Sequence, residues 1–119
     1  MIVAQQPWSI IFYTTESSKS PVEEFLSKLP NIAEARMAKG IALLAGAGFR
    51  LGPPWIKKID DELWELRAVG GEMNLRILFC REGHEFILLH AIKKKQQKLP
   101  RRDIEIAHER RKEYKERFG

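Results

Sequence analysis

Two arginines and a run of lysines are the residues of this sequence best suited to chemistry on a phosphate group. Arg67 and Arg76 lie on either side of a Gly-Gly turn dipeptide, and Lys93-Lys94-Lys95 follows a mostly apolar run. A guanidinium group holds two phosphate oxygens at once and stays charged. Chemistry on a phosphate ester needs such cations around the phosphorus, a base for the attacking hydroxyl and an acid for the leaving oxygen.

The two arginines lie on predicted strands over residues 63–69 and 74–80, and a third strand is predicted over 86–92. If the loop after the first strand has an even number of residues, Arg67 and Arg76 share one face and lie nearly opposite each other. They would then repel unless an anion lies between them. An odd loop would separate them, and both possibilities remain open. The alternative is that each pairs with a surface carboxylate, Arg67 for example with Glu72.

Other polar residues extend this predicted site. Lys93 and Lys95 share one side of an extended chain and Lys94 faces the other, so at most one of these two sets lines the site. Plain solvated charge is the alternative for all three lysines. His90 has a side chain that titrates near neutral pH, which suits acid–base work. A histidine between apolar neighbours in a strand is, however, also typical of a hydrogen-bonded core residue.

Glu65 shares a predicted face with Arg67, and either orients that arginine or acts as a base. Lys57 and Lys58 on a short predicted strand, and Lys98 after the third strand, are candidate contacts to the RNA backbone, with plain solvated charge as the alternative. One cysteine and scattered histidines predict no metal site. No cofactor is expected.

Positive charge is concentrated at one end of the chain. Residues 93–119 contain 11 Lys and Arg against 5 Asp and Glu, whereas residues 1–92 contain 10 against 11. Such a concentration favours a polyanionic partner such as nucleic acid, and a salt-bridged, solvated helix is the alternative. The 119 residues predict a single domain. No charged leader and no long apolar run is found, which favours a cytoplasmic location.

The predicted order of elements is β-α-α-β-β-β-β-α, an α+β domain. After a loose lead-in over 1–6, a strand is expected over 8–14. A helix then begins after Ser20, its expected N-cap, and a second helix is expected over 32–45. A brief strand over 56–59 precedes the three strands above. A basic C-terminal helix over 100–118 carries a narrow stripe formed by Ile104, Ala107, Arg111, Tyr114 and Phe118. Because Arg111 interrupts this stripe, the helix is predicted to dock only partly.

The succession of motifs resembles the phage-derived, HigB-type branch of the RelE/ParE toxin superfamily over roughly residues 8–118. The most specific pieces are Trp-Glu-Leu-Arg at 64–67, the strand that carries Arg76, and Leu-His-Ala-Ile-Lys-Lys-Lys-Gln-Gln-Lys-Leu-Pro at 89–100. The resemblance implies a twisted antiparallel sheet with an N-terminal helical hairpin against it. RelE-type nucleases use a tyrosine and lysines for proton transfer, and the matched motifs contain no tyrosine.

The resemblance also implies a function. HigB-type members are toxins of type II toxin–antitoxin modules, often paired with a helix-turn-helix antitoxin, and cleave messenger RNA in the ribosomal decoding site without a metal. A ParE-like gyrase inhibitor, or an inactive phage relic that only binds an antitoxin, is the alternative. The catalytic residues expected are Arg67, Arg76, Lys94, Lys95 and His90. Lys57, Lys58, Lys93 and Lys98 are expected to bind RNA, and Glu65 to support the arginines.

Overall fold

The computed structural model describes residues 7–70 and 74–119. It has the predicted α+β class and the predicted order of elements. A short 3-10 helix, η1, is added between the second helix and the second strand. In chain order the elements are β1 (Ser9–Phe12), α1 (Pro21–Ser27), α2 (Asn31–Ala47), η1 (Gly48–Leu51), β2 (Ile56–Lys58), β3 (Trp64–Arg67), β4 (Leu75–Glu82), β5 (Glu85–Lys93) and α3 (Arg101–Phe118).

The five strands form one sheet in the order β1-β5-β4-β3-β2. Strands β2 to β5 are an antiparallel meander, as expected. Strand β1 joins the edge beside β5 in the parallel sense, so the sheet is mixed and not wholly antiparallel. The reason is connectivity: the chain after β1 passes through two helices and three strands before β5, which leaves either direction of pairing open.

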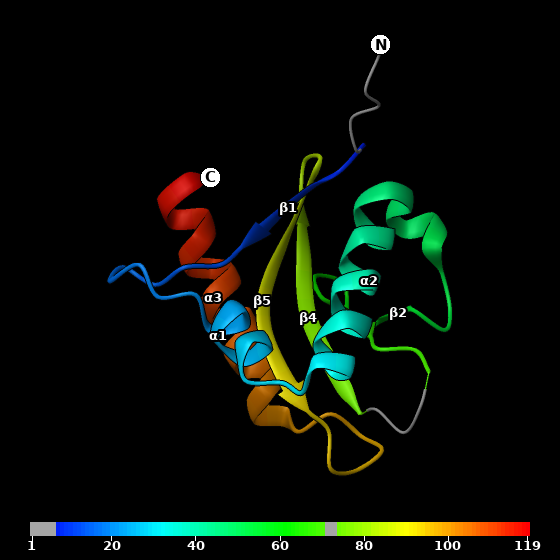
Figure 1. Ribbon diagram of the computed structural model, residues 1–119. Helices are drawn as coiled ribbons and strands as arrows, with labels where there is room; N and C mark the ends of the chain where they lie inside the picture. Colours follow the sequence, from blue (N-terminus) through cyan, green and yellow to red (C-terminus); the bar gives the residue numbers. More distant parts are fainter. Residues whose placement is uncertain (1–6, 71–73) are drawn as a thin grey trace.

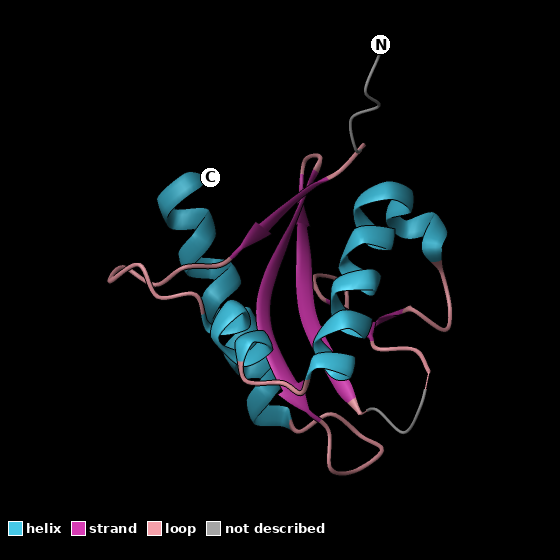
Figure 2. Cartoon of the chain, viewed as in Figure 1, coloured by secondary structure: helices cyan, strands magenta, loops and turns pink. Residues whose placement is uncertain are grey.

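Helices cover both faces of the sheet (Figure 1). On one face, α1 and α2 pack through residues such as Val22, Met37 and Leu44 onto Ile77 and Phe86 of the sheet. On the other face lies α3, drawn behind the strands in Figure 2, where its Ala107 joins a second apolar cluster. Successive apolar residues of the central strands therefore point to opposite faces, and both faces are buried, as in a sheet that lies between two layers of helices.

Local signals fix the ends of the first two helices. The Ser20 hydroxyl accepts a hydrogen bond from the backbone N–H of Glu23 and caps α1, and Pro21 begins that helix, as predicted. Gly48, with a φ of 59°, ends α2 in a backbone conformation that favours glycine. None of the helices within residues 7–70 and 74–119 has the length and apolar character needed to cross a membrane.

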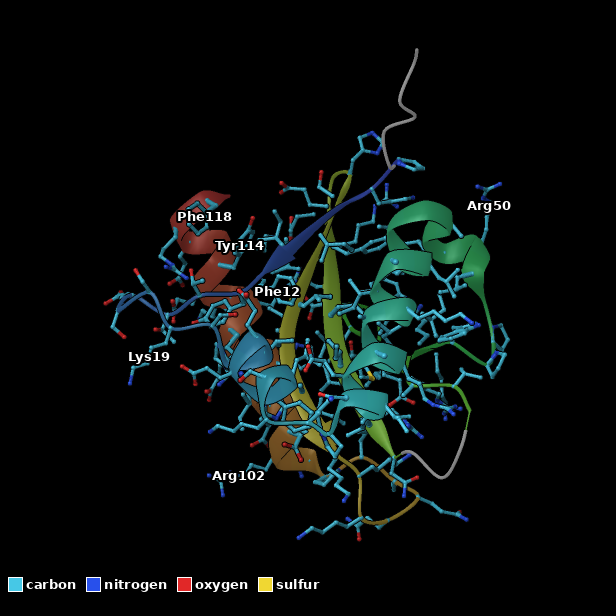
Figure 3. All side chains as sticks on the ribbon, viewed as in Figure 1. Phe12, Lys19, Arg50, Arg102, Tyr114 and Phe118 are labelled. Carbon is cyan, nitrogen blue, oxygen red and sulfur yellow. The ribbon has the colours of Figure 1, made fainter. Side chains whose placement is uncertain are left out.

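Helix α3 docks through polar contacts as well as through the apolar residues of its predicted stripe. Arg111 forms an ion pair with Glu62, and the imidazole of His108 lies 2.7 Å from the Asp60 carboxylate. Phe118, the last residue of the predicted stripe, is 65% exposed at the free end of the helix (Figure 3). The helix therefore docks only partly, as predicted.

Candidate functional site

The two candidate arginines face each other across neighbouring strands. Arg67 of β3 and Arg76 of β4 are direct Cα partners in the sheet register. The loop between them therefore has the even parity that puts both side chains on one face. Glu65 shares that face, because it lies two residues before Arg67 and opposite Leu78 of the apolar cluster under α3.

The anion between the two guanidinium groups is the carboxylate of Glu65. Its Oε1 accepts a hydrogen bond from Arg67 Nε at 3.0 Å and lies 3.0 Å from Arg67 Nη2. Its Oε2 lies 3.9 Å from Arg76 Nε. The Glu65 side chain is only 2% exposed, so it can relieve the repulsion between the arginines at short range. The alternative partner considered for Arg67, Glu72, lies outside the described residues.

One carboxylate balances only one of the two guanidinium charges, so the cluster keeps a net positive charge. Arg76 donates from Nη1 to the backbone oxygen of Leu75 at 2.9 Å, while its Nε has no hydrogen-bond partner among the described residues. Burial lowers the pKa of Arg76, the Glu65 carboxylate raises it, and the Arg67 charge lowers it further. A guanidinium with unused donors and incomplete compensation is suited to binding an oxyanion.

Two neighbouring hollows open beside this cluster, at the end of the sheet where β5 leaves it. The first, of about 480 Å³, is lined by Asn74, Arg76, Lys94, Lys95, Gln96 and Gln97. The second, of about 320 Å³, is lined by Lys57, Lys58, Ile59, Glu65, Lys94, Gln97, Lys98, Leu99 and Ile104. Lys94 and Gln97 line both and therefore separate them. The segment after β5 is visible as the loop at the bottom of Figure 1, next to the start of β4.

Lys94 is the cation between the two hollows. Its backbone N–H donates to the Asn74 carbonyl at 2.6 Å, which ties the segment after β5 to the start of β4. Burial lowers the pKa of Lys94. The Glu65 carboxylate acts in the opposite direction, and the charges of Arg76, Arg67 and Lys57 lower the pKa further. An ammonium with a lowered pKa gives up its proton more readily than an ordinary lysine.

The structure brings most of the other candidate cations to these hollows. Lys95 lines the first, and Lys57, Lys58 and Lys98 line the second. Of these, Lys58 also forms an exposed ion pair with Asp61 at 3.5 Å. Lys93, at the end of β5, is exposed and lines neither hollow.

His90 lies outside both hollows and is hydrogen-bonded on both ring nitrogens. Arg110 Nη1 donates to His90 Nδ1 at 3.1 Å and to the Leu89 carbonyl at 2.8 Å. Because Nδ1 accepts, the proton of the neutral ring is on Nε2, which donates to Asp103 Oδ1 at 2.7 Å. These contacts join β5 to α3, as in the hydrogen-bonded core alternative. The catalytic role of His90 stays a prediction that its position outside the hollows does not support.

The hydrogen bonds of His90 predict a pH-dependent stability. Burial lowers its pKa below 6.5; Asp103 opposes the shift and Arg110 adds to it. The unfolded chain therefore binds more protons than the folded one as the pH falls through about 6.5, and stability is lost in that range, by at most about 1.4 kcal/mol per pH unit for one proton. Chemical denaturation between pH 8 and pH 5 should show this loss, and His90→Gln should reduce it. An unchanged slope in His90→Gln would contradict the assignment.

The apolar and amide residues of the hollows were not singled out from the sequence. Ile59, Leu99 and Ile104 come from three separate segments, and no single motif brings them together. Asn74 lies two residues before Arg76, and Gln97 lies beside Lys98 within the family motif at 89–100, and these positions were the signals that could have indicated them. Within residues 7–70 and 74–119, no three His, Cys, Asp or Glu side chains are grouped so as to hold a metal ion.

Comparison with known proteins identifies relatives. The model of the family described as "Phage derived protein Gp49-like (DUF891)" matches residues 24–112. The "Probable endoribonuclease HigB1" proteins of two Mycobacterium tuberculosis strains are each 41% identical to this chain over 64 residues, which is 54% of this chain and 51% of theirs. The chain thus spans about half the length of the curated relatives it matches. The predicted resemblance to the phage-derived HigB type is confirmed by these matches.

Proposed function

Because the chain belongs to the Gp49-like family of phage-derived proteins, we propose that it is the toxin of a type II toxin–antitoxin module. Its proposed activity is metal-independent cleavage of messenger RNA in the ribosomal decoding site. The observation that carries the proposal is the cationic cluster of Arg67, Arg76 and Lys94 around the buried Glu65, beside an open hollow. The endoribonuclease name of the HigB1 relatives agrees with this chemistry.

In the proposed reaction, the scissile phosphate binds in the first hollow. The Arg76 guanidinium, which lines this hollow, donates to a phosphate oxygen and stabilises the charge of the phosphorane, with Arg67 adding positive charge from the neighbouring strand. Glu65 holds the two guanidinium groups in position. Lys95 adds charge at the mouth of the hollow, and the exposed lysines Lys57, Lys58, Lys93 and Lys98 follow the RNA backbone on either side.

Lys94 is the proposed general acid. Its ammonium lies between the two hollows, and its lowered pKa brings proton donation closer to neutral pH. The 2′-oxygen attacks phosphorus and its proton passes to solvent water, the P–O5′ bond breaks, and Lys94 Nζ donates a proton to the leaving 5′-oxygen. Lys94→Arg keeps the charge but not the acidity, so it should retain RNA binding and lose cleavage.

The proposed partners follow from the proposed role. The ribosome with its bound messenger RNA would be the target, and a helix-turn-helix antitoxin encoded beside the toxin would neutralise it. Both place the protein in the cytoplasm. The lysine-bearing rim of the two hollows is positively charged, which suits the phosphate backbone of RNA.

The proposal is tested by inducible expression followed by primer extension on abundant messages. The expected result is arrest of growth and translation, with new 5′-ends inside reading frames that are being translated and none on untranslated RNA. Growth arrest with intact messages and induction of DNA-damage signalling would instead identify a gyrase inhibitor. Normal growth with intact messages would leave only antitoxin binding. Either of the last two results overturns the nuclease proposal.

A further inference from the structure

The opposed arginine pair lies at the end of the pairing between β3 and β4. Arg67 is the last residue of β3, so the loop that joins the two strands begins directly after it. Glu65 balances one of the two guanidinium charges, and the remaining repulsion pushes the two backbones apart. Beyond the pair, Ala68 N–H donates to the Leu75 carbonyl at 3.3 Å, which is long for this type of hydrogen bond. A contact from outside the hairpin would therefore help to keep the arginines opposite each other.

Arg36 of α2 makes such a contact from the other face of the sheet. Its half-buried side chain donates from Nη1 to the Val69 carbonyl, with 3.4 Å between the two atoms. Val69 lies two residues after Arg67, so the contact ties the first part of the loop to α2. A hydrogen bond with a charged donor is stronger than one between neutral groups.

The glycine after Val69 makes room for this contact. Gly70 adopts a φ of 101°, and a Cβ built on it would lie 1.8 Å from Arg36 Nη1 and 3.1 Å from Arg36 Cζ. The guanidinium therefore occupies the space that a side chain at position 70 would fill. Glycine serves both the backbone conformation of the loop and the approach of Arg36.

The last part of the loop is held from a different element. Lys94 N–H donates to the Asn74 carbonyl at 2.6 Å, and Asn74 and Arg76 both line the first hollow. The segment after β5 thus holds the chain that leads into Arg76, and α2 holds the chain that follows Arg67. Contacts from outside the hairpin therefore help to set the separation of the two guanidinium groups.

We propose that Arg36 is a positioning residue for the arginine pair. It holds Val69 and Gly70 in place, so that Arg67 stays opposite Arg76 when a phosphate binds beside them. Arg36 lines neither hollow and acts through the backbone alone. The inference rests on the proposed function for its reaction, in which a small misplacement of charged groups lowers the rate of the chemical step.

The test compares variants of α2 in single-turnover cleavage of messenger RNA on programmed ribosomes. Arg36→Ala should lower the maximal rate about tenfold, with less than a twofold change in the ribosome concentration that gives half of that rate. Lys39→Ala removes the same charge from an exposed position of α2 and should change neither quantity. Arg36→Lys keeps a cationic donor and should recover part of the rate. An unchanged rate in Arg36→Ala, or an equal loss in Arg36→Lys, would overturn the proposal.

Two glycine variants test the same contact without removing the arginine. Gly70→Ala places a Cβ where the Arg36 guanidinium lies, so it should lower the rate as Arg36→Ala does, and the double variant should be no slower than the slower single variant. Gly83→Ala is the control, because Gly83 has a φ of 61° in the turn between β4 and β5 and open space around its Cα. It imposes backbone strain without displacing a side chain and should leave the rate unchanged. Losses that multiply in the double variant would contradict the shared contact.

NMR signals of the arginine Nε–H groups separate this inference from the proposed function. Arg36→Ala should shift the signals of Arg67 and Arg76, and Lys39→Ala should not, whether or not the protein cuts messages. These shifts in a protein that leaves messages intact would overturn the proposed function alone. Cleavage by the natural protein, with the rate and both signals unchanged in Arg36→Ala, would overturn only the positioning role.

Discussion

Replacing Arg76 with alanine should lower messenger-RNA cleavage at least about a hundredfold and allow cells that express the variant to grow. Arg76 lines the first hollow, and the single Glu65 carboxylate compensates its charge only in part, because that carboxylate also pairs with Arg67. Loss of one donor that is aimed at transition-state charge typically lowers the rate by about two to three orders of magnitude. Primer extension on a translated message, with protein levels matched by immunoblot, measures the effect.

This variant should fold. Removing Arg76 relieves the repulsion with Arg67, and Glu65 keeps its two contacts with Arg67. Arg50→Ala is the matched control, because Arg50 lies exposed on η1 and points away from the molecule (Figure 3). It should leave cleavage and toxicity unchanged. An Arg76→Ala protein that folds and still cuts messages at the natural rate would remove Arg76 from the site.

The face on which each strand residue lies was predictable, because side chains alternate with a period of two. Trp64, Leu66 and Ala68 pack in the core under α1 and α2, and Glu65 and Arg67 lie on the other side, as the alternation predicts. The pairing of Arg67 with Arg76 was not predictable. Gly70 adopts a φ of 101°, a conformation open to glycine, and a Gly-Gly dipeptide leaves the loop length and its parity free.

The identity of the anion between Arg67 and Arg76 was also not predictable from the sequence. Like charges opposite each other predict an anion, and a phosphate was the first candidate for it. Register puts Glu65 between them instead, since the neighbour two residues along a strand lies on the same face. We therefore expect a phosphate to bind the unused donors of Arg76 and not to lie between the two arginines. Which oxygen of Glu65 is occupied depends on side-chain rotamers, which sequence periodicity does not encode.

The basic C-terminal region was likewise predictable only in part. Its net charge was evident from the sequence, but its role depends on partners from distant segments. Arg111 and Arg117 of α3 pair with Glu62 and Glu113, which fits the salt-bridged helix considered as the alternative. The cations at the hollows belong instead to the loop after β5, where Lys94, Lys95 and Lys98 lie.

Replacing Glu65 with leucine should cause the largest loss of stability of any single charge removal in this cluster. Two guanidinium groups on directly opposed residues would then face each other without the carboxylate, with the Arg76 side chain only 12% exposed. Removal of one partner from a buried ion pair typically costs about 3–5 kcal/mol, because the remaining charge is left uncompensated. Urea denaturation monitored by tryptophan fluorescence gives the free energy of unfolding.

A double variant tests whether charge is the cause. Glu65→Leu with Arg76→Leu removes one guanidinium together with the carboxylate, so it should be more stable than Glu65→Leu alone, and the interaction energy of the cycle should be at least about 1 kcal/mol. Glu16→Leu, at an exposed carboxylate in the turn after β1, should change stability by less than about 0.5 kcal/mol. If the double variant is no more stable than Glu65→Leu, then lost packing and not the opposed arginines accounts for the destabilisation, and Glu65 is not the residue that permits Arg67 and Arg76 to lie side by side.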